Sequence, residues 1–86
     1  MKGVNLIPYH TIYSSDVGLD CVHVIHDADG KISRFGSRGK GKLEFRGPNS
    51  LVVDDAGNLI VCDGLNYKLK VVSKHHEYLG LIKVKN

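Results

Sequence analysis

Short apolar runs separated by turn residues dominate the second half of the chain, and they predict β-strands. Residues 51–53 and 59–62 are two such runs, each of strand length and rich in β-branched side chains. Between them, the Asp-Asp-Ala-Gly-Asn stretch at 54–58 is typical of a hairpin turn. A third strand is expected over 68–72 and a fourth, weaker one over 78–84. Four short strands in succession predict an all-β fold built from antiparallel four-stranded meanders.

The third predicted strand alternates in polarity. Leu69 and Val71 fall on one face, and Lys68 and Lys70 fall on the other, because successive side chains of a strand point to opposite faces. No window of the chain shows a sustained apolar spacing of helical period, so the sequence predicts no helix.

The chain also contains an internal repeat. A shift of 47 residues, the separation of Asp16 from Asp63, superposes the apolar strand positions without a gap. The superposed pairs are Val4 with Leu51, Leu6 with Val53, Ile12 with Leu59, Val22 with Leu69, Val24 with Val71, Ile25 with Val72 and Ile32 with Leu79. A period in this range fits a blade of four strands better than a helical repeat. The first copy is degenerate, since Thr11, Ser14 and Leu19 stand where the second copy has Asn58, Val61 and Asn66.

A glycine-rich segment precedes the second copy. Glycines at 36, 39, 41 and 47 are followed by Pro48. Only glycine reaches positive φ at low cost, and proline fixes its own φ, so this composition predicts a long, ordered loop. The segment lacks the spacing and the following helix of a phosphate-binding loop, which argues against phosphate binding.

Together, the loop, the turn and the strands resemble an NHL repeat, which is one blade of a β-propeller. The resemblance covers residues 35–72, and the matching positions are Phe35-Gly36, Phe45 to Pro48, Asp54, Gly57-Asn58, Asp63, Asn66, Lys68 and Val71-Val72. Two departures occur: Lys68 replaces the usual arginine, and Gly64-Leu65 replace a more polar pair. Lysine lacks the planar donor fork of arginine, so any bidentate contact at this position would be weaker.

The resemblance implies a propeller that is incomplete in this chain. Residues 1–34 are expected to form a degenerate or partial blade, and residues 35–86 an NHL-repeat blade with its closing strand. The length corresponds to about 1.8 blades, whereas propellers close with four to eight. Three outcomes are therefore open: a piece of a longer protein, which we favour, a ring of several copies, or two packed sheets with exposed edges. Open edges would also allow self-association.

Most motif residues are expected to have structural roles. This set comprises Gly36, Pro48, Asp54, Gly57, Asn58, Asp63 and Asn66. Asp63 and Asn66 are expected to cap the turn between the second and third strands by bonding local backbone amides.

A cluster of cations around the loop is the candidate binding surface. Its predicted contact residues are Arg38, Lys40, Lys42, Arg46, Tyr67 and Lys68. Such a cluster can contact a phosphate backbone while an aromatic ring stacks on a base. An ordinary solvated loop is the alternative. The NHL resemblance implies a non-catalytic platform for protein or RNA, as in regulatory proteins of the tripartite-motif and ubiquitin-ligase type.

Composition narrows the remaining possibilities. Twelve Lys and Arg against nine Asp and Glu give a net charge of +3, which is mildly basic. No apolar run is long enough for a membrane span, and no signal peptide is evident, so we expect a soluble, cytoplasmic protein with no membrane partner. Cys21 and Cys62 are expected to be reduced and buried in strands.

Enzyme activity stays open at this stage. His23 and His26 fall on opposite faces of a predicted strand, and His75-His76 fall in a turn, so no quartet of metal ligands is predicted and neither metal nor cofactor is expected. Cys21 and His10 could be combined with an aspartate only on paper. The alternative function is a fragment of a propeller enzyme, a metal-dependent lyase or hydrolase, whose active site lies in other blades.

Overall fold

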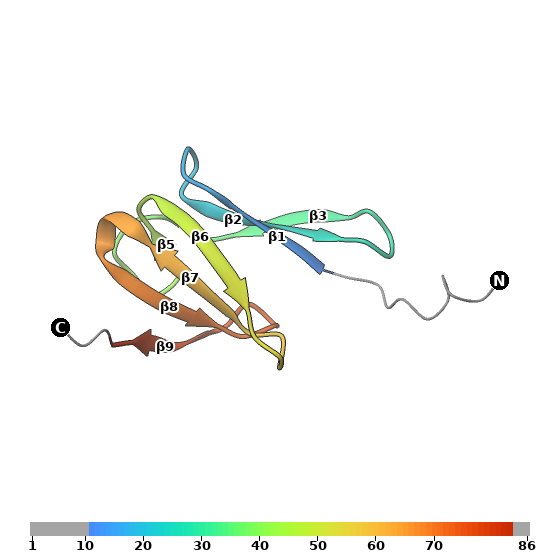
Figure 1. Cartoon of the computed structure of the whole chain (residues 1–86). Coiled ribbons are helices and arrows are strands. Elements are labelled where there is room, and N and C mark those ends of the chain that lie inside the picture. Colours follow the sequence, from blue (N-terminus) through green and yellow to red (C-terminus); the bar gives the residue numbers. More distant parts are fainter. Residues whose placement is uncertain (1–10, 84–86) are drawn as a thin grey trace.

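The computed structural model describes residues 11–83 and is all-β, with antiparallel sheets (Figure 1). A first sheet has three strands in the order β1 (Thr11–Asp16), β2 (Cys21–His26) and β3 (Ile32–Phe35). A second sheet has four strands in the order β6 (Pro48–Val53), β7 (Leu59–Asp63), β8 (Lys68–Val72) and β9 (Tyr78–Ile82). The connecting loop contains the short parallel pair β4 (Ser37–Arg38) and β5 (Glu44–Phe45), and a 3-10 turn η2 (Gly64–Asn66) joins β7 to β8. Residues 11–83 contain no α-helix.

The antiparallel meander predicted for the second half is confirmed. All neighbouring strands of the second sheet pair antiparallel, and the predicted strands fall on β6 to β9. The hairpin between β6 and β7 closes through the backbone, where the Asp54 amide donates to the Asn58 carbonyl at 2.8 Å and the Gly57 amide to the Asp54 carbonyl at 3.0 Å. Residue 84, where the fourth strand was expected to end, lies outside the described residues.

The internal repeat is visible in the strand positions. A shift of 47 residues places β1 on β7, β2 on β8 and β3 on β9, within one residue at the ends. The predicted pairings of Val4 with Leu51 and of Leu6 with Val53 lie outside the described residues. Each repeat is thus a set of consecutive antiparallel strands with the same order.

The two sheets share one hydrophobic core. It consists of Val22, Phe45, Leu59, Val61 and Val72, with Tyr13, Phe35, Leu43 and Leu51 packed against it. Residues from both sheets and from the connecting loop take part, so the sheets pack face to face. Figure 1 shows β1 of the first sheet beside β6 of the second, where the two also make contact.

The face of β8 that is buried differs from what polarity alone suggests. The alternation of the strand is as predicted, but Lys70 and Val72 are buried against the core, whereas Leu69 and Val71 lie half-buried on the opposite face. Lys68 is exposed. A buried lysine requires a partner for its charge, and the structure provides one in Asp63.

The connecting loop is folded back onto the core through Phe45. A Cβ at Gly36, where φ is 92°, would lie 2.4 Å from the Phe45 ring. Glycine is therefore needed at this position both for its backbone conformation and for the space it leaves. The close packing of Gly36 on the buried Phe45 ring explains why this loop is ordered, as the sequence predicts.

Candidate functional site

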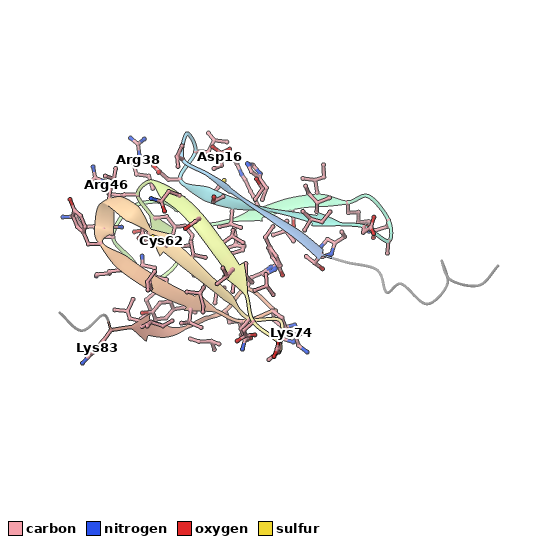
Figure 2. The ribbon with its side chains drawn as sticks, in the orientation of Figure 1. Asp16, Arg38, Arg46, Cys62, Lys74 and Lys83 are labelled. Atoms are coloured by element: carbon pink, nitrogen blue, oxygen red, sulfur yellow. The ribbon has the colours of Figure 1, made fainter. Side chains whose placement is uncertain are left out.

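One end of the molecule gathers three segments that are distant in sequence. The turn after β1, the connecting loop and η2 meet there, and Figure 2 shows Arg38 and Arg46 at the same end as Asp16. The backbone joins loop and turn, because the Leu65 amide donates to the Arg46 carbonyl at 2.8 Å and the Gly64 amide to the Gly47 carbonyl at 3.2 Å.

Asp20 ties the first sheet to the connecting loop. Its carboxylate accepts from the Gly47 amide and from Arg38 Nε, each at 2.8 Å. The Gly47 amide and then the Arg38 guanidinium hold the pKa of Asp20 below its usual value. Asp20 also adopts a left-handed backbone, with φ at 53°, which aspartate tolerates better than most residues.

Asp63 has the corresponding role in the second sheet and is fully buried. Its Oδ1 accepts from the Arg46 amide at 2.6 Å, and its Oδ2 accepts from Asn66 Nδ2 at 2.7 Å and pairs with Lys70 Nζ at 3.0 Å. The predicted capping of the local turn by this side chain is wrong, because η2 has no side-chain cap and the amide that Asp63 binds lies 17 residues earlier. The carboxylate stabilises the meeting of loop and sheet instead.

Asn66 also acts across the fold. Its Nδ2 donates to the Gly39 carbonyl at 2.9 Å as well as to Asp63. The predicted local bonds to backbone amides are therefore replaced by bonds to a carbonyl and a carboxylate, because the connecting loop lies directly beside η2.

Lys70, like Asp20, has a role that the sequence analysis did not predict. Its ammonium donates to the carbonyls of Gly41, at 2.8 Å, and Glu44, and lies 5.3 Å from the centre of the Phe45 ring. Together with Asp63 it forms a buried ion pair that holds the connecting loop. One sequence feature could have indicated this burial: Lys70 stands two residues before Val72 and therefore lies on the same face of the strand.

The remaining motif residues have positions in turns and strand starts. Asp54 Oδ1 accepts from the amides of Ala56 and Asn58, each at 2.9 Å, and so closes the hairpin after β6. Gly57 supplies a positive φ of 88° in that hairpin, and Pro48 is buried at the start of β6. Asn58 contributes its backbone carbonyl to the same turn.

Five of the six predicted contact residues share the end described above. Arg38 and Arg46 line a hollow of about 270 Å³ with Val17, Asp20, Gly47 and Leu65. Tyr67 and Lys68 line a second hollow of about 410 Å³ with Asn49, Cys62, Asp63, Gly64 and Leu69. Lys40 follows Gly39, whose carbonyl is bound by Asn66, and is exposed.

Lys42 is separated from the other five. Its ammonium lies 5.7 Å from the centre of the Tyr78 ring. Tyr78 pairs with Val72, at the opposite end of β8 from Lys68. The structure therefore divides the predicted cluster into a basic end, formed by Arg38, Lys40, Arg46, Tyr67 and Lys68, and a single lysine directed towards β9.

Tyr67 is the aromatic residue of the basic end. Its side chain is 89% exposed, and its backbone is left-handed with φ at 57°. A bulky residue in this conformation is uncommon and costs backbone energy. Neither packing nor backbone preference therefore explains a tyrosine at this position.

In the first repeat, the positions equivalent to Asp63 and Lys70 are occupied by Asp16 and His23. His23 Nε2 lies 2.8 Å from Asp16 Oδ2 and 3.8 Å from Cys21 Sγ. The hydrogen bond with His23, followed by that from the Leu19 amide, lowers the pKa of Asp16. Both partners face the same ring nitrogen, whereas a catalytic triad needs one nitrogen for the nucleophile and the other for the carboxylate. The geometry thus disfavours a Cys-His-Asp triad here.

The two predicted strand cysteines differ in burial. Cys21 is buried in the first sheet and Cys62 is half-buried in the second. His23 and His26 lie on opposite faces of β2, as their spacing predicts: His23 is cross-strand from Ser14 and His26 from Thr11, at positions of opposite parity along β1.

Comparison with models of known protein families gives no match. A search among curated proteins likewise finds no similar sequence. In the part of the chain that the structure describes, no helix has the length and apolar character needed to cross a bilayer.

Proposed function

We propose that the chain forms two consecutive blades of an NHL-type β-propeller, which acts as a non-catalytic interaction module, and that its basic end binds single-stranded RNA. The setting implied by the NHL resemblance is a regulatory protein of ubiquitin-ligase type. The blade assignment and the RNA assignment rest on separate observations.

The blade assignment is supported by how the repeat relates the sheet faces. The core-facing side of the first sheet carries Tyr13, Val22, Val24 and Phe35. The residues that correspond to these four after the shift of 47 positions are Ile60, Leu69, Val71 and Ile82. Those four lie on the face of the second sheet that points away from the first, where they are half-buried or exposed.

A surface buried in one repeat is therefore open in the next. Faces that match in this way make head-to-tail contacts, which continue from unit to unit until a ring closes. A β-propeller is such a ring of sheets. The open face of Ile60, Leu69, Val71 and Ile82 would then be covered by a further sheet, supplied by a longer chain or by another copy.

Self-association in solution tests the blade assignment. The 86-residue chain is expected to form larger particles with a β-type circular dichroism spectrum, as measured by light scattering. Val71→Glu, on the open face, is expected to reduce this association, whereas Asp55→Lys in the exposed β6–β7 hairpin is the control. A folded monomer at high concentration, unchanged by Val71→Glu, would contradict the assignment.

The RNA assignment depends on a single observation: an exposed tyrosine lies among four cationic residues on an ordered surface. Cations neutralise phosphates, and an aromatic ring stacks on a base with little dependence on sequence. The strained backbone at Tyr67 supports a role outside folding, because a smaller residue would fit the turn better. The order of the surface comes from the buried Asp63–Lys70 pair beneath it.

Fluorescence anisotropy with a labelled single-stranded RNA of mixed sequence tests this assignment. Charge reversal by Lys40→Glu and Lys68→Glu is expected to abolish binding, and higher salt is expected to weaken it steeply. Tyr67→Ala is expected to weaken binding by about tenfold, since stacking contributes roughly 1–3 kcal/mol per base.

Lys42→Glu is the matched control, because it makes the same charge change in the same loop but away from the basic end. Equal losses for Lys42→Glu and Lys40→Glu would contradict the assignment. So would an affinity that barely changes with salt, or an acidic peptide that binds as tightly as RNA and is unaffected by Tyr67→Ala.

A further inference from the structure

A group of three potential metal ligands lies at the end of the first sheet, and none of the three is among the five residues of the basic end. A carboxylate oxygen of Asp16, Sγ of Cys21 and a ring nitrogen of His23 lie within 4.8 Å of one another. We propose that these three residues bind a zinc ion.

The strand register brings the three side chains together. Asp16 ends β1 and Cys21 begins β2, and the two are paired directly across the sheet. His23 follows Cys21 by two residues, so its side chain lies on the same face of β2. In the sequence, only the turn from Val17 to Asp20 separates Asp16 from Cys21.

Two of the three separations lie within about 0.5 Å of those in a tetrahedral zinc site. With bonds of about 2.0 Å to nitrogen and oxygen and about 2.3 Å to sulfur, ligand atoms lie roughly 3.3 to 3.6 Å apart. The Sγ–Nε2 distance of 3.8 Å needs to close slightly, and the Nε2–Oδ2 distance of 2.8 Å needs to open by about half an ångström.

Asp16 is already oriented for this role. Its Oδ1 accepts from the amides of Gly18 and Leu19, at 2.9 and 3.0 Å, which leaves Oδ2 directed at His23. Such outer hydrogen bonds fix the orientation of ligating carboxylates in metal sites. A mixed set of sulfur, nitrogen and oxygen suits zinc, and three protein ligands leave a fourth position for water.

The second repeat has a cation beside the equivalent carboxylate. The shift of 47 residues places Asp16 on Asp63 and His23 on Lys70. In the second repeat the Lys70 ammonium lies beside the carboxylate at 3.0 Å and also binds two loop carbonyls. In the first repeat, His23 Nε2 lies 2.8 Å from the Asp16 carboxylate, and a neutral imidazole, unlike an ammonium, can bind a metal ion together with that carboxylate.

The three ligand residues differ in their exposure to solvent. The side chains of Asp16 and His23 are each 29% exposed, whereas Cys21 is buried. Zinc and solvent can therefore reach the carboxylate and the imidazole, while the sulfur is shielded.

Cobalt(II) substitution tests the proposal on the reduced 86-residue chain. Addition of Co²⁺ is expected to give visible bands of a four-coordinate ion and a sulfur-to-cobalt charge-transfer band, and Zn²⁺ is expected to displace both. Cys21→Ser is expected to remove the charge-transfer band. His23→Gln is expected to weaken binding by more than the roughly 10- to 100-fold that loss of an outer partner costs.

Cys62→Ser and His75→Gln are the controls, since each removes the same type of ligand at a position outside the group. Both are expected to bind Co²⁺ as the unsubstituted chain does, and circular dichroism shows whether each variant is folded. Zn²⁺ is also expected to raise the melting temperature of the unsubstituted chain and of Cys62→Ser, but not of His23→Gln. A charge-transfer band that survives Cys21→Ser, one that disappears with Cys62→Ser, or no cobalt spectrum at all would overturn the proposal.

Discussion

The two repeats place a carboxylate at the same position and use it differently. In the second repeat, Asp63 and Lys70 are both buried and together hold the connecting loop. In the first repeat, Asp16 and His23 form a pair that is partly open to solvent and holds only its own turn. The strands are alike, so the difference comes from what covers each pair. A buried charge needs several partners, and those partners are the loop backbone.

The turns between paired strands show a similar contrast. Asp20 and Tyr67 are related by the shift of 47 residues, and both have a left-handed backbone, with φ at 53° and 57°. Asp20 uses its side chain to bind the connecting loop, whereas the Tyr67 side chain extends into solvent. The repeat therefore fixes the backbone of the turn, while each side chain is free to take a separate role.

The largest expected effect is a difference in the free energy of unfolding between variants of Asp63 and of Asp16. Asp63→Asn leaves the Lys70 ammonium buried without its counter-charge, and removal of one member of a buried pair costs about 3–5 kcal/mol. Asp16→Asn is expected to cost much less, because asparagine can keep the amide bonds of the turn and the site is partly solvated. Urea unfolding followed by circular dichroism measures both. Similar losses for the two variants would show that burial is not what distinguishes the repeats.

A smaller effect, of opposite sign, is expected at the left-handed turn. Tyr67→Asn should stabilise the chain by about 0.5–1 kcal/mol, because asparagine tolerates this backbone better than tyrosine. Asp20→Asn keeps the backbone preference but loses the charge that faces Arg38, so it should lower the melting temperature.

The Tyr67→Asn variant also links stability to binding. It should lose RNA affinity as it gains stability, in the manner of functional residues that are poorly suited to their local structure. A variant that is less stable than the original chain would show that Tyr67 has a structural role that its exposure does not reveal.

The smallest expected effect concerns the hairpin turns. His76, in the turn after β8, stacks on Phe35 of the first sheet with ring centres 4.9 Å apart, and its Nε2 lies 3.3 Å from the Tyr13 hydroxyl. Burial, and then the neighbouring His26 and His75, lower the pKa of His76 below 6.5. The folded chain therefore binds a proton at His76 less readily than the unfolded chain does.

Stability should accordingly decline as the pH falls below about 6.5, until the lowered pKa of His76 is reached. The carboxylates Asp16 and Asp20 add their own loss only below a pH of about 3.8, because their pKa values are lowered. His76→Phe should remove the decline of stability that begins below a pH of about 6.5. His75→Gln should keep most of that decline. Melting temperatures measured across this range would contradict the assignment if both variants retained the slope.

Local patterns in the sequence are sufficient to predict the strands, the turns and the repeat. Apolar runs such as 59–62 and turn residues such as Asp54 and Gly57 act over a few neighbouring positions, so local pattern is enough to place them. The sequence also places the candidate contact residues in the connecting loop and at the turn after β7, and their role in binding stays a prediction. The shift of 47 residues was likewise visible without coordinates, because strands of equal length and order repeat at equal spacing.

The tertiary structure is needed to explain how the polar residues are used. It buried Lys70 instead of its strand neighbours, directed Asp63 to an amide 17 residues away, separated Lys42 from the basic end, and brought Cys21 and His23 to Asp16. These outcomes depend on which loop or sheet lies opposite each side chain. A charge inside a protein is stabilised by partners that are distant in sequence, and only the packing of the two sheets against the connecting loop supplies them.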